Sequence, residues 1–286
     1  MHTTPSIHRQ PTARSVTLSA GPMPRSTVPL LALLLLISTV AQAAPPSCAG
    51  VSGSTLPLVI ELFTSEGCSS CPPADVWASR ASQEKGLAGT ILLAEHVDYW
   101  DDLGWPDPYA QHAFSTRQQN YTAARHARGV YTPQVIVAGE ELVDWPQPGA
   151  LTERAVRQAA RPASVQLRVT VDRVEGDAVF VQVQTHAGAS MPVDALQSAR
   201  LTLALTEDGL LQQPGAGENR GRPLHHDGVV RVQATRPATD GSSSWVLHRA
   251  PGQDWHRSHL VALVQQGEVG TMLQALSVPL ASCGVP

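Results

Sequence analysis

Two cysteines three residues apart, Cys68 and Cys71, stand between segments of different pattern. The apolar run of residues 58–64 predicts a buried strand, and the spacing of apolar and small residues over 72–86 predicts a helix. This context places Cys68 at a helix N-terminus, where free backbone N–H groups and the helix dipole stabilise a thiolate. We interpret the pair as a redox dithiol, with Cys68 as the exposed nucleophile and Cys71 as the resolving thiol. A static disulfide that holds the turn is the alternative.

The first 43 residues have the pattern of a secretory signal peptide. Arg25 precedes an apolar run over residues 28–37, and Ala41-Gln42-Ala43 supplies the small-residue cleavage pattern. Met23 is an alternative start of the same signal. The apolar run is too short for a confident membrane span, so we expect none after signal cleavage. The mature protein is predicted to be periplasmic or secreted, in an oxidising compartment where disulfides persist.

Four cysteines remain after the predicted cleavage, and an even number in an exported protein indicates two disulfides. Cys68 and Cys71 are the local pair, which leaves Cys48 for Cys283. We predict that Cys48 and Cys283 form a structural disulfide between the two ends of the mature chain. The competing interpretation is that Cys48 pairs with another protein or carries a lipid.

The remaining pattern predicts two domains. Predicted strands cover residues 58–64, 90–97, 135–138 and 141–144, and predicted helices cover residues 72–86, 110–128 and 151–160. After residue 162, apolar and polar residues alternate through about seven short segments, which indicates an antiparallel β-sandwich. The expected fold is therefore an α/β domain at 44–161, with a central mixed sheet flanked by helices, followed by an all-β sandwich domain at 162–286.

Several short strings form a set across the mature chain. They are Glu61-Leu62-Phe63-Thr64-Ser65, Cys68-Ser69-Ser70-Cys71-Pro72-Pro73-Ala74-Asp75, His96-Val97-Asp98-Tyr99-Trp100-Asp101, Leu103-Gly104-Trp105, Arg117-Gln118, Tyr121, Tyr131-Thr132-Pro133-Gln134 and Gly217-Glu218-Asn219. The dithiol and the Thr-Pro element before a strand resemble the thioredoxin superfamily. The full set more closely resembles a family of secreted thioredoxin-like proteins of unknown function. The resemblance implies a thioredoxin-like fold for residues 44–161 and brings no established activity.

The resemblance also implies roles for three residues outside the dithiol. The Thr132–Pro133 bond is expected to be cis and to lie against the dithiol, with the Thr132 backbone binding an extended substrate. Glu61 is expected beneath the dithiol, where burial raises its pKa and it relays a proton to Cys71. The alternative for Glu61 is a carboxylate paired with another side chain or turned to solvent.

His96 and Asp98 follow the second predicted strand. Strands joined by a right-handed crossover run parallel, so their carboxyl ends meet at the edge that carries the dithiol. His96 is therefore a candidate general base, a metal ligand together with Cys68 and Cys71, or a substrate contact. A histidine satisfied by local hydrogen bonds is the competing interpretation.

Other aromatic and histidine residues have weaker claims. Tyr99, Trp100 and Trp105 either roof the site or form the core of the loop that carries them. For the segment 225–227, which contains two histidines and an aspartate, an exposed turn is favoured over a metal site.

These patterns predict an exported thiol-disulfide oxidoreductase that exchanges with protein or small-molecule thiols and disulfides. A copper- or zinc-handling protein is the first alternative, because two thiolates and an imidazole suit soft metals. A non-catalytic extracytoplasmic scaffold is the second. The net charge of −4 and the lack of a basic stripe argue against nucleic acid as a partner. No cofactor is expected, and the oligomeric state and the direction of the redox reaction stay open.

Overall fold

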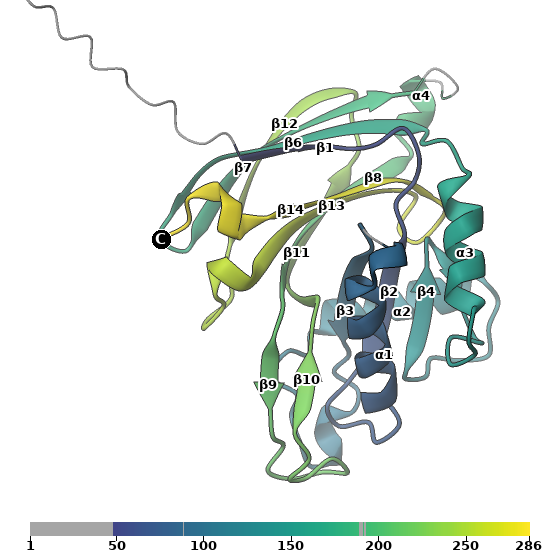
Figure 1. Ribbon diagram of the computed structural model, residues 1–286, viewed down its shortest axis with the longest axis vertical. Coiled ribbons are helices and arrows are strands. Elements are labelled where there is room, and N and C mark those ends of the chain that lie inside the picture. Colours follow the sequence, from purple (N-terminus) through teal and green to yellow (C-terminus); the bar gives the residue numbers. More distant parts are fainter. Residues whose placement is uncertain (1–47, 88, 189–190, 192) are drawn as a thin grey trace, which may run out of the picture. The chain divides into compact units, whose positions relative to one another are not determined.

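The computed structural model describes residues 48–87, 89–188, 191 and 193–286, all within one compact unit (Figure 1). The predicted signal peptide, residues 1–43 with the alternative start Met23, lies outside the described residues. Within the described ranges, no helix is long and apolar enough to cross a membrane.

The molecule is mostly β-sheet. The helices are α1 (Pro72–Gln83), α2 (His112–Ala124), α3 (Ala150–Ala159) and the single turn α4 (Val193–Leu196). The strands are β1 (Cys48–Val51), β2 (Val59–Thr64), β3 (Ile91–His96), β4 (Gln134–Val137), β5 (Glu140–Glu141), β6 (Val165–Glu175), β7 (Ala178–Ala187), β8 (Ala199–Glu207), β9 (Leu210–Gln212), β10 (Leu224–His226), β11 (Val229–Pro237), β12 (Gly241–His248), β13 (Ser258–Gln266) and β14 (Met272–Pro279).

One eight-stranded sheet runs through the molecule in the order β14-β13-β8-β11-β3-β2-β4-β5. Strands β2 and β3 pair in parallel, with Thr64 opposite His96, and β4 runs antiparallel to β2. Both β2 and β3 are buried along their whole length, as expected of parallel strands covered on two faces. The carboxyl ends of β2 and β3 therefore meet at one edge of the sheet.

The predicted fold class is wrong. A helix-flanked thioredoxin-like sheet followed by a separate sandwich would keep strands 58–144 apart from those after residue 162. Instead β11 pairs with β3 in parallel, with Val229 opposite Ala94, and β8, β13 and β14 extend the same sheet. Strands from both sides of the predicted boundary at residues 161/162 thus share one sheet. Local alternation predicts that a segment is a strand, but it carries no information about a partner far away in the sequence.

The junction between β3 and β11 depends on a glycine. The N–H of Ala94 donates to the carbonyl of Gly228 at 2.8 Å, which brings the two backbones together. Gly228 has a φ of +63°, and a Cβ there would lie 2.6 Å from Leu92 Cγ. Only glycine satisfies both the backbone conformation and this close approach.

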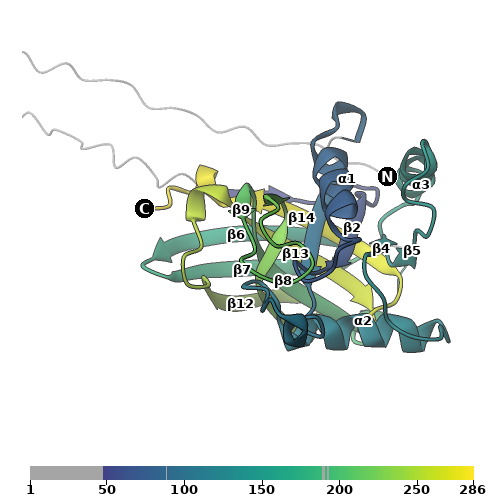
Figure 2. The ribbon, with the colours of Figure 1, turned by 90° about the horizontal axis from the view of Figure 1, so that it is seen from below.

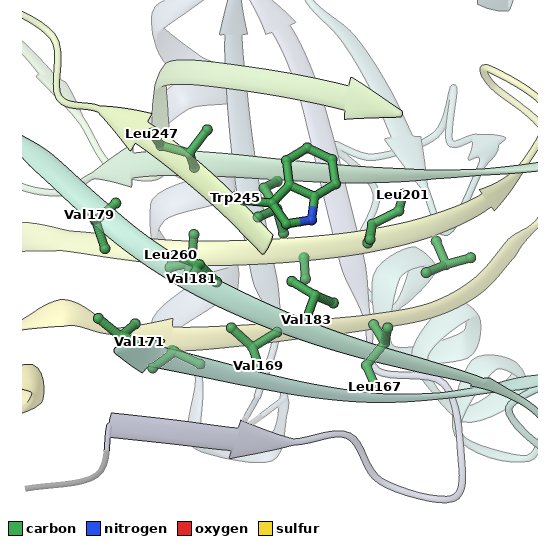
Figure 3. Packing of buried hydrophobic residues seen from close by; sticks show 14 of the residues in the cluster. Leu167, Val169, Val171, Val179, Val181, Val183, Leu201, Trp245, Leu247 and Leu260 are labelled. Atoms are coloured by element: carbon green, nitrogen blue, oxygen red, sulfur yellow. The ribbon is translucent and has the colours of Figure 1, made fainter. Parts of the chain in front are cut away.

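A second sheet, in the order β1-β6-β7-β12, stacks on the far part of the large sheet. The alternating residues predicted for the sandwich form its core, shown in Figure 3. This core includes Leu167, Val169, Val181, Leu203, Trp245 and Leu260. Burial of alternate side chains from two facing sheets is the ordinary way in which stacked sheets hold together.

Helices α1 and α2 lie on opposite sides of β2 (Figure 2). Ala74 and Ala78 of α1 pack with Ile60 and Leu62, whereas Phe63 packs edge-on against Tyr121 of α2, with ring centroids 5.9 Å apart. Successive side chains of a strand point to opposite faces. The two faces of β2 are therefore chemically distinct, and this determines where its polar residues point.

A disulfide joins Cys48, at the start of β1, to Cys283, after β14. The Cα atoms lie 4.8 Å apart, and this is the pairing predicted from the sequence. The bridge ties the first described strand to the end of the chain.

Candidate functional site

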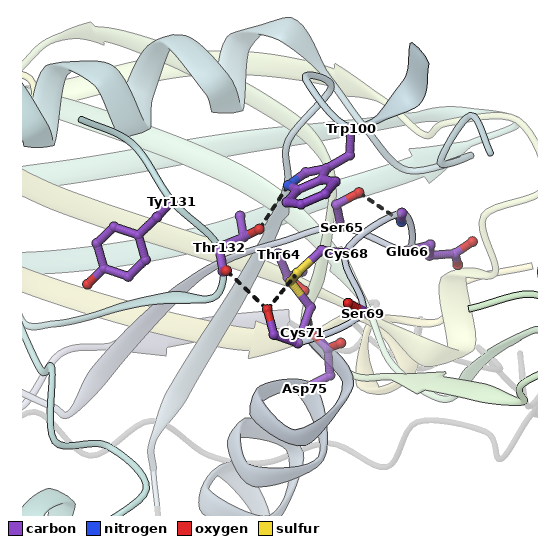
Figure 4. The surroundings of a disulfide bond; sticks show 12 residues. Thr64, Ser65, Glu66, Cys68, Ser69, Cys71, Asp75, Trp100, Tyr131 and Thr132 are labelled. Atoms are coloured by element: carbon purple, nitrogen blue, oxygen red, sulfur yellow. Dashed lines mark hydrogen bonds between the residues drawn. A yellow bond between two sulfur atoms is a disulfide. The ribbon is translucent and has the colours of Figure 1, made fainter. Parts of the chain in front are cut away.

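Cys68 and Cys71 form a disulfide in the turn between β2 and α1 (Figure 4). Both cysteines are fully buried, at 0% exposure, whereas Ser69 and Ser70 between them are exposed. Cys71, not Cys68, is the N-cap of α1, which begins with Pro72. The prediction of an exposed Cys68 at the helix start is therefore wrong, because the helix begins one residue after Cys71.

The turn lies against Thr132, whose bond to Pro133 is cis, as predicted. Ser70 Oγ lies 3.4 Å from Cys68 Sγ and donates to the Thr132 carbonyl at 3.4 Å. The Trp100 indole Nε1 donates to Thr132 Oγ1 at 2.9 Å, and its ring lies beside the dithiol turn (Figure 4). Trp100 packs closely against this turn, since a Cβ at Gly67 would lie 3.0 Å from Trp100 Cβ. Trp100 thus roofs the turn, one of the two roles predicted for it.

Glu61 does not take the expected place near the dithiol. It is fully buried, ion-paired with Arg117, and accepts a hydrogen bond from Tyr121 Oη at 2.6 Å. Because strand side chains alternate, Glu61 points with Phe63 to the α2 face of β2, away from α1. The structure matches the alternative interpretation, a carboxylate paired with other side chains.

Asp75 is the buried acid next to the dithiol, and the sequence reasoning assigned it no role. It lies one helical turn after Cys71, and its carboxylate Oδ1 accepts a hydrogen bond from Thr64 Oγ1 at 2.8 Å (Figure 4). Burial raises the pKa of Asp75, and the opposing attraction of His226 and His96 does not cancel this. The signal that could have identified it is its position four residues after Cys71, on the inward face of the helix.

His96 lies next to Thr64 in the parallel register, behind the dithiol turn and fully buried. Its Nδ1 is 2.7 Å from Asp107 Oδ2. Burial lowers the pKa of His96, but the charge and hydrogen bond of Asp107 outweigh it, so the pKa is raised. The same pair holds the pKa of Asp107 below its usual range against the effect of burial. The structure therefore shows His96 paired with Asp107, and its roles as general base or substrate contact stay predictions.

His226 joins this cluster from the distant strand β10. The favoured interpretation of segment 225–227 as an exposed turn is wrong for His226, which is 3% exposed. Its Nε2 lies 3.2 Å from Glu66 Oε1, and its ring is 5.0 Å from that of His96. Glu66 Oε2 accepts from Trp105 Nε1 at 2.8 Å, so Trp105 also belongs to the surroundings of the site. Tertiary pairing brings His226 here, and no local pattern signals that.

The loop between β9 and β10 holds the dithiol turn from the side. Asn219 Nδ2 donates to the carbonyls of Glu66 and Cys68, at 2.8 and 2.9 Å. Glu218 Oε2 accepts from the Ser69 backbone N–H at 3.2 Å. The resemblance had marked Gly217-Glu218-Asn219 as a recurring string, but not that it contacts the dithiol turn.

Asp98 and Tyr99 contribute elsewhere. Asp98 accepts a hydrogen bond from Ser115 and pairs with His112 at 3.0 Å, so it fixes the first turns of α2. Tyr99 donates to Gln118 Oε1 at 3.1 Å. Both residues position α2 and do not contact the dithiol through these bonds.

The alternative metal set does not assemble. Cys68 and Cys71 are joined to each other, and His96 bonds Asp107. In the part of the chain that the structure describes, no three His, Cys, Asp or Glu side chains are arranged to hold a metal ion. The dithiol, its buried acid and the cis-proline segment are therefore the chemistry that the site offers.

Comparisons with known proteins bear on family and fold. The model of the family described as "Protein of unknown function (DUF1223)" matches residues 59–265. No curated protein matches the chain. A crystal structure of a protein from Agrobacterium tumefaciens is similar, with 24% identity, a TM-score of 0.57, and coverage of 79% of this chain and 96% of that one. HBP35 of Porphyromonas gingivalis is similar, with 17% identity, a TM-score of 0.56, and coverage of 80% and 76%. At these identities the likeness concerns the fold alone.

Proposed function

The chain belongs to this family of unknown function, and we propose that it is an exported thiol-disulfide oxidoreductase. One arrangement carries the proposal. The Cys68–Cys71 disulfide contacts the segment of the cis Thr132–Pro133 bond through Ser70, and a buried acid, Asp75, lies one turn beyond it. A disulfide that only holds a turn needs no neighbouring acid.

The proposed exchange is reversible; written in the direction that reduces a substrate, the thiolate of Cys68 attacks one sulfur of a substrate disulfide. A bond forms between Cys68 Sγ and that sulfur, the substrate disulfide bond breaks, and the leaving thiolate takes a proton. Cys71 then loses its proton to the Asp75 carboxylate and attacks Cys68 Sγ. The Cys68–Cys71 bond forms and the second substrate thiolate leaves, so two electrons pass from the dithiol to the substrate.

Asp75 suits the role of proton acceptor and donor because of its surroundings. It is 7% exposed, and its raised pKa brings protonation closer to neutral pH than for an ordinary carboxyl. The ion pair between His96 and Asp107 lies behind Asp75, where His96 lowers the pKa of Asp75 and Asp107 raises it. Asp75 therefore replaces Glu61 in the proposed mechanism.

Thr132 would orient the substrate. In the described part of the chain its backbone N–H has no hydrogen-bond acceptor, so it is free to bind an extended segment by strand addition. Trp100 holds the Thr132 side chain, and substrate binding would have to displace the Trp100 ring, because Cys68 is fully buried.

Export is supported by the predicted signal peptide and by the two disulfides, which persist in oxidising compartments. Both bonds are compatible with an extracytoplasmic protein. The periplasm or the exterior is therefore the proposed location.

Single-cysteine variants test the function. Reduced C71A protein treated with dithiobis(2-nitrobenzoate) should retain a persistent mixed disulfide on Cys68, because no resolving thiol remains. Reduced C68A protein should form far less adduct, since the Ser70 hydroxyl lies 3.4 Å from Cys68 Sγ, whereas Cys71 lies one helical turn before the Asp75 carboxylate, whose negative charge disfavours a thiolate there. Mass spectrometry of tryptic peptides locates the adduct. Equal adducts on both variants, or none on either, would contradict the mechanism.

A third variant separates proton transfer from folding. D75N keeps the hydrogen bond to Thr64 but cannot accept a proton. It should not slow adduct formation at Cys68, but it should slow the resolving step by about a hundredfold or more, the lower end of general-base effects. An unchanged resolving rate would return Asp75 to a structural role.

A further inference from the structure

We infer that the dithiol works as a reductant, so that the reduced protein donates two electrons to substrate disulfides; this rests on the proposed function and names its direction. The basis is that the turn around Cys68 offers a thiolate few free hydrogen-bond donors in predominantly negative surroundings. A dithiol becomes a strong oxidant when its reduced, thiolate form is stabilised, and a reductant when it is not.

Most backbone donors of the turn are already committed, and among residues 66–71 only the Ser70 N–H has no acceptor. Two N–H groups donate to carboxylates: that of Glu66 to Asp107 Oδ2 at 2.8 Å and that of Ser69 to Glu218 Oε2 at 3.2 Å. The other three donate within the turn: the N–H of Gly67 to Ser65 Oγ at 3.1 Å, that of Cys68 to the Ser65 carbonyl at 3.2 Å, and that of Cys71 to the Cys68 carbonyl at 3.3 Å. The next two residues, Pro72 and Pro73, have no N–H. Helix N-termini stabilise thiolates through free N–H groups, and here the first turn of α1 lacks them.

Ser70 remains as the donor next to the Cys68 sulfur, through its backbone N–H and its hydroxyl. Ser70 Oγ lies 3.4 Å from Cys68 Sγ, but its hydroxyl also donates to the Thr132 carbonyl. A hydroxyl that is shared in this way gives only part of its hydrogen bond to a thiolate.

The charges around the turn are predominantly negative. Four carboxylates surround the turn. Glu66 is part of it and pairs with His226. Asp107 and Glu218 accept from its backbone N–H groups, and Asp75 lies in the first turn of α1. Two imidazoles, His96 and His226, each lie against one of these carboxylates. Within the described residues no Arg or Lys forms an ion pair with any of the four. Even with both imidazoles protonated, the carboxylates outnumber the cations.

Glu218 has the most direct effect of the four. Its carboxylate accepts the hydrogen bond of the Ser69 N–H, a donor that directly follows Cys68 and would otherwise be available to a thiolate. It also adds a negative charge beside the turn, and a like charge disfavours ionisation of a thiol. Glu218 therefore favours the disulfide over the thiolate form.

The reaction that follows consumes disulfides and requires a source of electrons. The substrate, a protein or small-molecule disulfide, is reduced to two thiols, while Cys68 and Cys71 are oxidised to the disulfide. A donor of the dithiol class must return the pair to the reduced form, through the same exchange in the opposite direction.

Redox titration of the full mature chain tests this inference. The purified protein is equilibrated in glutathione buffers of graded composition and in dithiothreitol buffers, then quenched, alkylated and analysed by mass spectrometry. We expect the Cys68–Cys71 pair to stay oxidised across the glutathione series and to become reduced in dithiothreitol. A pair that is half reduced in mildly reducing glutathione would overturn the inference, while mixed-disulfide trapping on Cys68 would still support the proposed function. If the pair exchanges with neither reagent while the protein stays folded, both the inference and the proposed function are overturned.

Two matched variants test the part played by Glu218. E218Q removes one negative charge and weakens the acceptor for the Ser69 N–H, and E84Q removes the same charge from an exposed residue at the far end of α1. E218Q should shift the equilibrium toward the reduced pair by about three- to tenfold, tenfold being about 30 mV for two electrons. It should also lower the pH at which Cys68 is alkylated, and E84Q should change neither. Equal behaviour of the two variants would overturn the role of Glu218.

Discussion

Replacing Gly228 by alanine should destabilise the protein more than any ordinary glycine replacement in a turn. Gly228 lies at the point where β3 and β11 join the two halves of the chain. Alanine would face two separate costs there, one from its backbone conformation and one from the contact of its Cβ with Leu92.

The size of the effect follows from these two costs. Placing an alanine at a φ of +63° costs about 1–2 kcal/mol, as for other residues in the left-handed region. A Cβ would lie 2.6 Å from Leu92 Cγ and 2.7 Å from the Leu92 carbonyl oxygen, so the backbones must move apart. Such overpacking costs about 1–3 kcal/mol, which gives a total of roughly 2–5 kcal/mol.

Gly176 provides the matched control. It has a φ of +61° in the turn between β6 and β7, and a Cβ there would meet no atom within 4 Å. G176A therefore bears only the backbone cost, so G228A should lose about 1–3 kcal/mol more. Urea unfolding with both disulfides intact, followed by circular dichroism and extrapolated linearly, measures the difference. If G228A lost no more stability than G176A, the tight junction between β3 and β11 would be refuted.

Three further perturbations have defined outcomes. Burial raises the pKa of Glu95 from its ordinary value of 4.5 to about 8, so between these pH values the folded state keeps a proton that the unfolded state has lost. Stability should therefore fall as pH rises from 4.5 to 8, by at most about 1.4 kcal/mol per pH unit, and urea titrations of E95Q should show a flatter profile. W100A should speed reduction of the Cys68–Cys71 bond by dithiothreitol several-fold, because the ring roofs a fully buried disulfide, while W100F should keep most of the protection; equal rates for all three proteins count against a roof. Replacing both Cys48 and Cys283 by serine removes a bridge that spans 235 residues and should lower the free energy of unfolding by about 5 kcal/mol in the chain-entropy model. Urea unfolding measures this loss, and an unchanged midpoint would show that the bridge contributes no stability.

Local sequence patterns were sufficient to predict some parts of the site. The Cys68–Cys71 pair lies in the turn between β2 and α1, and the Thr132–Pro133 bond is cis. The first feature depends on a few consecutive residues, so spacing and turn chemistry carry the information, whereas the cis bond was implied by the resemblance.

Glu61 was expected next to the dithiol, where Asp75 lies instead, because the sequence does not show to which face of the strand each alternate side chain points. Glu61 lies on β2, but on the face that carries Phe63 and Tyr121, whereas Asp75 reaches the other face through Thr64. A strand buried on both faces has apolar residues on each of them, so its pattern does not reveal which face meets α1.

The contribution of the second half could not be predicted for a different reason. Asn219 and His226 reach the dithiol turn because β11 pairs with β3 and places the β9–β10 hairpin beside α1. Strand pairing between distant segments depends on the whole core. The same long-range pairing explains why the predicted separate sandwich is wrong.

The two disulfides are nested, since the Cys48–Cys283 bond encloses the Cys68–Cys71 bond in the sequence. As the chain emerges from its N-terminal end, Cys48, Cys68 and Cys71 all appear long before Cys283. An oxidant acting in order of appearance would join Cys48 to Cys68, which is not a native pair. Short loops close at lower entropic cost than long ones, so early closure of the Cys68–Cys71 ring removes both competing thiols. Cys48 then waits for Cys283, 235 residues further on, so the oxidative maturation of this protein is not complete before that cysteine has arrived.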